Sequence, residues 1–233
     1  MKKTKVKQIP FNMTDPIYMS FFAAFLALSG TTVITFLATF TETAKENRYL
    51  RSALISETCV NVIAGFAYAY FMKYLYEQKL ALEDVTSVRY LDWFLTTPLL
   101  LVSFALFASY SYDKTDKIDL TPLTYIIVFN LLMLYFGFMG ETGKMSRYPA
   151  FFLGFISYGL LMYFLYESYV KDKGSANENV FYVFVGVWAM YGFAYLMDVQ
   201  NKNITYNILD IISKAGFGML IWLSVTNEGP TTS

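Results

Sequence analysis

The charges of this chain fall into short clusters, and the long intervals between the clusters are apolar. A helix needs about 20 apolar residues to cross the hydrocarbon core of a bilayer. Hydrophobic residues make up 56% of the 233 positions and charged residues 15%, which is too apolar for an ordinary soluble domain of this size. The pattern predicts an all-α, seven-transmembrane-helix bundle with helices near 17–40, 48–76, 88–111, 120–140, 148–169, 179–198 and 204–226.

The connections between these intervals are short and carry turn-forming and charged residues. We therefore expect a single seven-helix domain over residues 1–233, with short tails at 1–16 and 227–233. The basic start MKKTKVK is also typical of a signal peptide, but the uncharged stretch that follows Asp15 is longer than a signal-peptide core, so we interpret it as a retained spanning helix. Basic residues flank this first span on both sides, so the positive-inside rule does not settle its orientation.

Histidine is absent and Cys59 is the single cysteine. An internal disulfide is therefore excluded, and thiolate or imidazole metal sites and catalytic triads are disfavoured, so we expect neither a metal site nor an enzyme. The formal net charge is +0, and no basic cluster alternates with aromatic residues, which argues against nucleic acid as a partner. The expected partner is the lipid bilayer, and the sequence leaves a homo-oligomer open.

The stretch RYLDWFLTTPLLLVS places Arg89 and Asp92 inside an apolar run. An ionised carboxylate within a span is costly unless it is paired, so Asp92 requires a partner cation elsewhere in the fold. The candidate is Lys214, which lies in the apolar segment NILDIISKAGFG one helical turn after Asp210. The alternative interpretation of Asp210 and Lys214 is a simple ion pair on one helix, which is typical of soluble surfaces rather than of membrane spans.

Thr96 and Ser103 extend the polar face that begins with Arg89 and Asp92, because their spacing puts all of them on one side of a helix. From Asp92 to Ser103 the helix rises roughly 16 Å, about half of the bilayer core. By themselves Thr96 and Ser103 are typical of polar contacts between helices. Together with two buried charges they indicate a functional line through the membrane.

The two motifs, RYLDW followed by TTPLL and the later LDIISKAGFG, resemble those of the microbial (type 1) rhodopsins over nearly the whole chain. The resemblance implies that Lys214 binds all-trans retinal as a Schiff base, with Asp92 and Asp210 as counterions and Asp92 as proton acceptor. It also implies an N-terminus outside and a cytoplasmic C-terminus. The positions that match the retinal-lining sites of the family are Trp93, Thr97, Leu100, Met133, Gly137, Gly154, Phe155, Tyr158, Trp188, Tyr191 and Tyr195.

The chain departs from the family at several positions. Outward pumps of the family usually carry an acid where this chain has Ser103, and the pattern Asp92, Thr96, Ser103 resembles a subset of marine and giant-virus rhodopsins. Gly192 replaces a common proline, which implies a different hinge for the light-driven movement of that helix. Tyr195 stands where an indole is also common. Leu100, by contrast, matches green-absorbing members, so the resemblance implies green absorption.

Glu57 lies in the expected 48–76 span, one turn before Asn61. If this helix begins at the cytoplasmic face near Arg48, Glu57 lies roughly 13 Å into the membrane, close to the depth of Ser103. Three interpretations stay open for Glu57: a structural carboxyl group, a replacement proton donor, or part of an ion path.

The leading hypothesis for function is a light-driven outward proton pump. The alternative is a light-gated cation channel on the same scaffold, which Glu57, Asn61 and the serine at position 103 would favour. A photosensor is a third hypothesis, although only the short tail NEGPTTS follows the last span.

Overall fold

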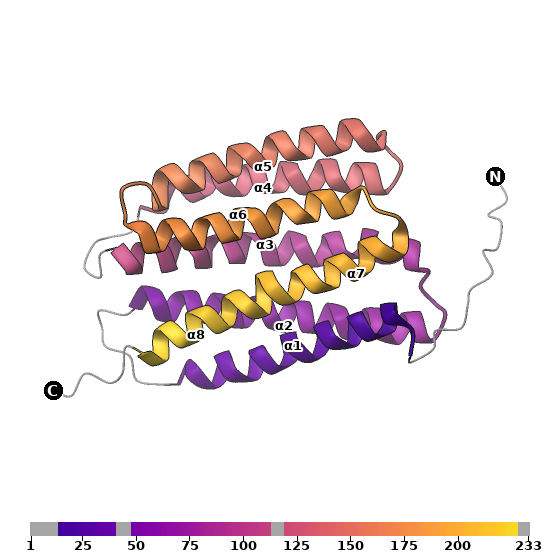
Figure 1. Ribbon diagram of the computed structural model, residues 1–233, viewed down its shortest axis with the longest axis horizontal. Coiled ribbons are helices and arrows are strands. Elements are labelled where there is room, and N and C mark those ends of the chain that lie inside the picture. Colours follow the sequence, from indigo (N-terminus) through magenta and orange to yellow (C-terminus); the bar gives the residue numbers. More distant parts are fainter. Residues whose placement is uncertain (1–13, 41–47, 113–118, 228–233) are drawn as a thin grey trace.

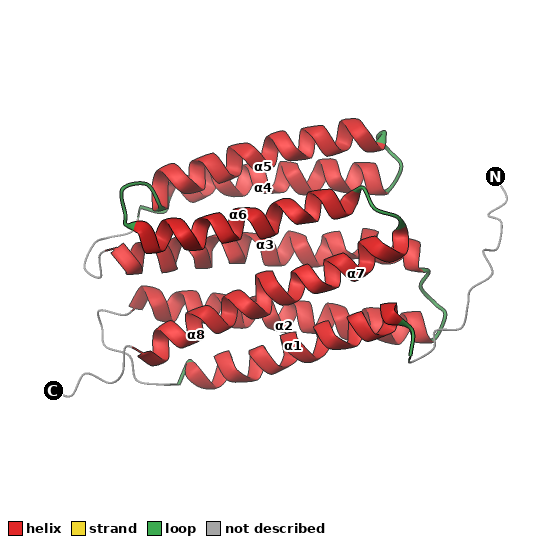
Figure 2. Cartoon of the chain, viewed as in Figure 1, coloured by secondary structure: helices red, strands yellow, loops and turns green. Residues whose placement is uncertain are grey.

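The computed structural model describes residues 14–40, 48–112 and 119–227. These residues form helices and the loops between them, with no strand among them (Figure 2). In chain order the helices are α1 (Pro16–Ala38), α2 (Arg48–Tyr76), α3 (Leu82–Tyr112), α4 (Thr121–Glu141), α5 (Arg147–Tyr169), α6 (Ser175–Tyr195), α7 (Val199–Asp210), the π-helix η2 (Ile211–Gly216) and α8 (Phe217–Asn227).

The last three elements form one continuous helix, Val199–Asn227, which we call helix seven. Within the described residues, six helices, helix seven included, are long and apolar enough to cross a membrane. The remaining helix is α6, whose first turns carry the polar residues of SANEN and so lower its mean hydropathy. The all-α, seven-transmembrane-helix fold predicted from the sequence is confirmed.

Two helices, α3 and α7, begin five or more residues earlier than the charge pattern suggests. α3 begins at Leu82 rather than near 88, with Glu83 and Asp84 in its first turn, where carboxylates interact favourably with the positive end of the helix dipole. α7 begins at Val199 rather than near 204, because the Asp198 carboxylate caps it. The backbone N–H of Asn201 donates to this carboxylate at 3.1 Å and lowers the pKa of Asp198. The charged residues at the starts of α3 and α7 therefore belong to the helix ends, whereas the charge pattern assigns them to loops.

Other expected bounds differ less. The 179–198 helix is found at Ser175–Tyr195, and the tails expected at 1–16 and 227–233 lie mostly outside the described residues. The charged connection between the third and fourth helices also falls largely outside them.

The helices run roughly alongside one another, with α4 and α5 along one edge of the view and α1 along the opposite edge (Figure 1). α1 packs on α2, α2 on α3, and α4 on α5. Helix seven contacts α1, α2, α3 and α6. Its side chains can therefore meet polar residues of α2 and α3 inside the bundle.

Large apolar side chains cover much of the outer surface, such as Phe66 on α2, Leu91 on α3 and Phe152 on α5. In water a surface of this kind favours aggregation, whereas in a bilayer it contacts the lipid chains. The exterior of the bundle thus suits a protein that lies within a membrane.

Candidate functional site

Lys214 lies at the centre of the buried polar residues. Its side chain is 1% exposed, and its Nζ atom lies 2.6 Å from Oδ2 of Asp92 and 3.5 Å from Oδ1 of Asp210. The other oxygen of Asp92, Oδ1, is buried and has no hydrogen-bond partner among the described residues. Asp92 is therefore the nearer of the two carboxylates and the one with a free acceptor oxygen.

Arg89 supplies the second buried cation. Its Nη1 atom donates a hydrogen bond to the Tyr68 hydroxyl at 2.9 Å and lies 3.5 Å from Oδ2 of Asp210. The Tyr68 hydroxyl in turn donates to the same Asp210 oxygen at 2.8 Å. Two amide oxygens, of Asn203 and Asn207, also accept hydrogen bonds from the guanidinium. With Lys214 and Asp92, these groups form a cluster in which two cations balance two carboxylates, as a buried site requires.

Aromatic rings enclose Arg89. The guanidinium carbon lies 5.1 Å from the ring centre of Phe21, 5.2 Å from that of Phe71 and 5.9 Å from that of Tyr206. Cation–π contacts of this kind partly replace the lost hydration of the charge. The side chain is 0% exposed. Neutral and aromatic groups therefore hold Arg89 in place together with Asp210.

Helix seven changes its winding at the lysine. The π-helix Ile211–Gly216 contains Lys214, and short π-helical segments inside α-helices are frequent at functional sites. The Lys214 carbonyl accepts a hydrogen bond from the Phe217 N–H and a longer one, at 3.5 Å, from the Asn61 side chain. The backbone of the lysine is thereby linked to α2.

A cavity of about 110 Å³ adjoins Lys214. One buried water needs only roughly 10–15 Å³, so the space suits a larger ligand. All eleven residues that the sequence predicted to line a retinal site line this cavity, from Trp93 on α3 to Tyr195 on α6. The wall also contains residues that the sequence analysis did not assign to it: Tyr90, Leu134, Ala150, Phe151, Ala189, Gly192, Tyr206, Asp210 and Ser213.

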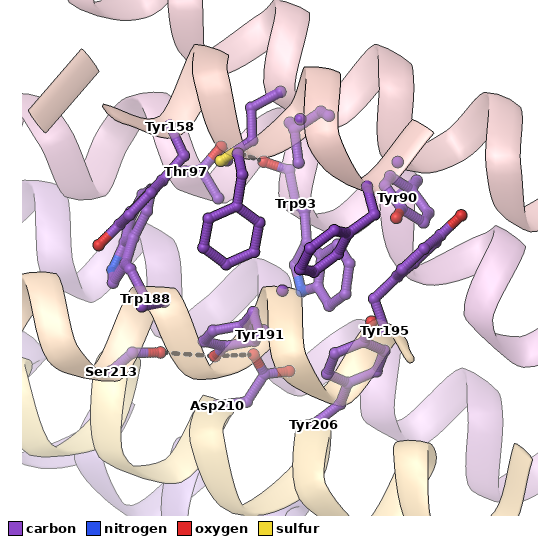
Figure 3. Close-up of a pocket in the computed structure, with 18 of the residues that line it drawn as sticks. Tyr90, Trp93, Thr97, Tyr158, Trp188, Tyr191, Tyr195, Tyr206, Asp210 and Ser213 are labelled. Carbon is purple, nitrogen blue, oxygen red and sulfur yellow. Dashed lines mark hydrogen bonds between the residues drawn. The ribbon is translucent and has the colours of Figure 1, made fainter. Parts of the chain in front are cut away.

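Aromatic rings surround the cavity, as Figure 3 shows. Trp93 stands between Trp188 on one side and Tyr195 and Tyr206 on the other. Its ring meets that of Tyr206 edge-on, with centroids 5.0 Å apart. The Tyr191 hydroxyl donates to Asp210 at 2.7 Å and shares a hydrogen bond of 2.8 Å with Ser213. The wall is thereby tied to the carboxylate pair.

The packing of the cavity wall explains why glycine stands at position 192. A Cβ atom at this position would lie 2.7 Å from Cζ of the Phe155 ring, closer than real Cβ atoms come. The ring of Phe155 therefore packs against bare backbone, and a larger residue at position 192 would displace it from the cavity wall. Gly137 is similar, because a Cβ atom there would collide with the Tyr90 hydroxyl.

This donor set fits a retinal. An amine, apolar and aromatic walls, and Asp210 as the other charged residue of the wall suit an apolar aldehyde that condenses with Lys214. The buried carboxylates would then face the nitrogen that carries the charge.

The remaining predicted residues lie outside the cavity wall. The Thr96 hydroxyl donates to the Asp92 carbonyl at 2.9 Å, and the Ser103 hydroxyl donates to the Ala53 carbonyl at 3.3 Å. Glu57 is 0% exposed, and neither of its carboxyl oxygens has a hydrogen-bond partner among the described residues. Ser103 of α3 lies near the Glu57 carboxyl group.

Sequence reasoning missed Tyr68 and the two asparagines that hold Arg89. Their spacing gave a signal. Asn203 and Asn207 precede Asp210 by seven and three residues, and Tyr68 follows Asn61 by seven, so each lies on the inward face of its helix. Polar residues at helical spacing from a known site residue therefore indicate further members of the site, as the charges do.

An ion pair joins α4 to α7 near the end of the bundle. Nζ of Lys202 lies 2.6 Å from Oε1 of Glu141, and the two side chains are 8% and 11% exposed. Nζ also lies 5.5 Å from the ring centre of Tyr195, a residue of the cavity wall. The ion pair therefore connects the ends of α4 and α7 next to Tyr195 of the cavity wall.

We expect Lys202→Met to reduce the free energy of unfolding by about 3 kcal/mol, because it leaves Glu141 nearly buried without its cation. The measurement is the midpoint of unfolding in detergent with increasing denaturant. The double variant Lys202→Met/Glu141→Gln removes both charges and should recover most of the loss. Equal stability of the single variant and the unmodified protein would show that the ion pair contributes nothing measurable to the free energy of unfolding.

Three comparisons with known proteins bear on this geometry. The sequence profile of the family described as bacteriorhodopsin-like protein matches residues 19–228. A green-light absorbing proteorhodopsin from Gamma-proteobacterium EBAC31A08 is 30% identical over 234 aligned residues, which cover 92% of this chain and 88% of that protein. The crystal structure of the viral rhodopsin OLPVRII has a TM-score of 0.85 and 29% sequence identity, over 91% of this chain and 99% of that chain.

A further similar structure is that of the proton pumping rhodopsin AR2 from the marine alga Acetabularia acetabulum. Its TM-score is 0.74 at 21% identity, over 92% of this chain and 96% of that chain, so the likeness concerns the fold alone. The profile match extends over nearly the whole sequence. This chain therefore belongs to the bacteriorhodopsin-like family of microbial rhodopsins, membrane proteins that bind retinal as a Schiff base of a lysine.

Proposed function

We propose that this protein is a light-driven outward proton pump. The observation that carries the proposal is the position of the Lys214 Nζ atom between two buried carboxylates, 2.6 Å from Asp92 and 3.5 Å from Asp210. A proton on this nitrogen therefore has an acceptor within hydrogen-bond distance inside the bundle. A relative named as a green-light absorbing proteorhodopsin supports the same assignment.

Lys214 is the residue we assign to the retinal linkage, since it is the lysine that adjoins the cavity. Bound retinal supplies the absorption of light and a change of shape at the lysine nitrogen. The protein supplies the proton acceptor. Asp210 already accepts hydrogen bonds from Tyr68 and Tyr191, whereas Asp92 has an oxygen without a partner. We therefore assign Asp92 as the acceptor and Asp210 as the permanent counterion.

The direction of transport follows from the proposed orientation. With the N-terminus outside, the end of the bundle where α1, α3 and α7 begin faces outward, and Arg89 and Asn203 lie toward that end. The end where α2 begins, toward which Glu57 lies, faces the cytoplasm. A proton that reaches Asp92 is then on the outer side of Lys214. Arg89 lies beyond it and, as a buried cation, disfavours the return of a proton from outside.

A light-gated cation channel is the second candidate, and one observation favours it. Glu57 and Asn61 have buried side-chain oxygens without hydrogen-bond partners among the described residues. Unpaired oxygens in a membrane span are typical of ion paths as well as of proton sites.

Illumination of vesicles or cells under voltage clamp separates the two functions. A pump passes outward current when the driving force is zero, because light supplies the energy. The current of a channel vanishes there and reverses with the ion gradient. Passive current that reverses, without current at zero driving force, would contradict the proposed pump.

Leu100 lines the cavity, and the family resemblance associates leucine at this position with green absorption. We therefore expect the protein reconstituted with all-trans retinal to absorb maximally in the green. An absorption spectrum in neutral buffer checks this, and a maximum in the blue would show that Leu100 does not set the colour.

A further inference from the structure

The hydrogen bonds of Arg89 go mainly to neutral groups. Its Nε atom donates to Oδ1 of Asn203 at 3.4 Å, its Nη2 atom donates to Oδ1 of Asn207, and its Nη1 atom donates to the Tyr68 hydroxyl at 2.9 Å. The contact with Oδ2 of Asp210, at 3.5 Å, is the longest of the four. Attraction to a carboxylate therefore does not by itself explain where the guanidinium lies.

The orientation of the Asn207 amide is set by α1. The Ser20 hydroxyl donates its single proton to the Ile17 carbonyl at 2.7 Å, so the Ser20 oxygen serves Asn207 as an acceptor. Nδ2 of Asn207 donates to this oxygen at 2.8 Å. The NH2 group of Asn207 thus faces α1, which leaves its carbonyl oxygen to face Arg89.

The Asn203 amide is oriented by backbone carbonyls. Its Nδ2 atom donates to the Val199 carbonyl at 2.9 Å and to the Leu82 carbonyl at 3.5 Å. A backbone carbonyl can only accept, so the Asn203 oxygen is the end of the amide that meets Arg89. Asn203 and Asn207 are each 0% exposed. Helix seven therefore presents two neutral oxygens, one turn apart, to the guanidinium, and both amides are oriented by uncharged groups.

The amide oxygens differ from the carboxylates in how they respond to proton transfer. A proton on Asp92 neutralises a carboxylate and weakens the electrostatic attraction on Arg89. The oxygens of Asn203 and Asn207 carry the same partial charge before and after that step. An arginine held by these amides stays in place at the moment when an arginine held by carboxylates alone is released.

We propose that Asn207, oriented by Ser20, is a positioning residue that holds Arg89 beyond Asp92 while Asp92 carries the proton. The Arg89 charge then stays between Asp92 and the outer end of the bundle, where it opposes the return of a proton from outside. This inference rests on the proposed pump. It brings α1, which contributes no residue to the cavity wall, into the reaction through Ser20.

Nitrogen NMR tests the hold on Arg89 in the retinal-bound protein kept in the dark. Arginine occurs as Arg48, Arg51, Arg89 and Arg147, so isotopic labelling of arginine gives few guanidinium signals, and Arg89→Gln identifies those of Arg89. We expect separate Nη1 and Nη2 lines, because the two groups have different partners. Asn207→Leu removes the acceptor of Nη2 and should move that line toward the position of a freely rotating guanidinium.

Ser20 tests the orientation of the amide, since its hydroxyl acts on Arg89 through Asn207. Ser20→Ala removes the acceptor of the Asn207 NH2 group and should move the Nη2 line in the same direction by a smaller amount. Ser20→Thr keeps a hydroxyl and should restore the unmodified spectrum. The matched control is Asn177→Leu, which removes a buried asparagine in the first turn of α6 and should leave the Arg89 lines unchanged.

The effect on transport is measured as photocurrent against membrane potential. A hydrogen bond to a charged group changes the population that it stabilises by at least roughly tenfold. We therefore expect the outward current of Asn207→Leu to fall about tenfold at an opposing potential, where proton return competes with transport, and to fall much less at zero driving force. Asn177→Leu should keep the ratio of the two currents found in the unmodified protein.

Two results would contradict the inference. Arg89 lines that Asn207→Leu leaves unchanged would show that Asn207 does not hold the arginine, and an unchanged ratio of the two currents would show that the hold does not limit proton return. If Asn207→Leu does not fold, Ser20→Ala, which leaves Asn207 in place, decides both points by the same measurements. If the unmodified protein passes no outward photocurrent at zero driving force, the proposed pump fails, whereas the NMR lines still decide whether Asn207 holds Arg89.

Discussion

Replacing Lys214 with alanine should abolish the visible absorbance that forms when all-trans retinal is added to the purified protein. Lys214 is buried, adjoins the cavity and is the lysine whose nitrogen lies within 4 Å of Asp92 and Asp210. Alanine has no amine to condense with the aldehyde, so the covalent bond cannot form. The positive charge on the lysine nitrogen, which Asp92 and Asp210 balance, is lost as well. The measurement is an absorption titration with retinal, in which the variant should show only free retinal.

The matched control is Lys73→Ala, which removes an exposed lysine of α2 that lies away from the cavity. It should bind retinal like the unmodified protein. Denaturation with acid then tests the linkage, because a covalent bond to lysine survives unfolding. Coloured adduct that survives denaturation in Lys214→Ala would place the bond on another lysine.

The spans could be predicted from the sequence because the transfer of apolar residues into lipid is the largest favourable contribution to the free energy of membrane insertion. The contact between Asp92 and Lys214 could also be anticipated, since an isolated charge within a span is too costly to leave unpaired. Both arguments depend only on the local sequence and on the free energy of transferring side chains from water into lipid. Neither requires knowledge of which helices are neighbours.

Helix ends and the partners of Arg89 could not be predicted in this way. The charge pattern assigns Glu83, at the start of α3, to a loop, although a carboxylate in a first helical turn is stabilising. Tyr68 reaches Arg89 across the contact between α2 and α3, and this contact is a property of the tertiary packing. The pairing of Glu141 with Lys202 lies at the ends of two helices, where the span argument gives no information.

The glycines illustrate a further limit. The family resemblance marks Gly192 as a departure from proline and suggests an altered hinge. The packing gives a more specific reason, because the Phe155 ring occupies the space in which a side chain at position 192 would lie. The two positions therefore form one unit of the cavity wall, and a substitution at either changes the shape available to the ligand.

Asp92→Asn should shift the absorption maximum to longer wavelength and reduce outward transport at least about 10²-fold, the lower range for loss of an acid–base partner. The Asp92 carboxylate lies 2.6 Å from the Lys214 nitrogen and stabilises its positive charge more than Asp210 at 3.5 Å does. A neutral amide stabilises the charged ground state less, which narrows the gap to the excited state, and it cannot accept the proton. Absorption spectra and photocurrents at zero driving force measure the two effects.

Acidification of the unmodified protein provides an independent test of the same residue. Protonation of Asp92 removes the same negative charge, so the absorption maximum should move to longer wavelength as pH falls, while that of Asp92→Asn should move much less. Asp84→Asn, which changes an exposed carboxylate in the first turn of α3, is the matched control and should titrate like the unmodified protein. The opposite result has two parts: the absorption maximum of the unmodified protein stays fixed from neutral to strongly acidic pH, and Asp92→Asn has the same maximum. This result would mean that Asp210 alone balances the charge on Lys214.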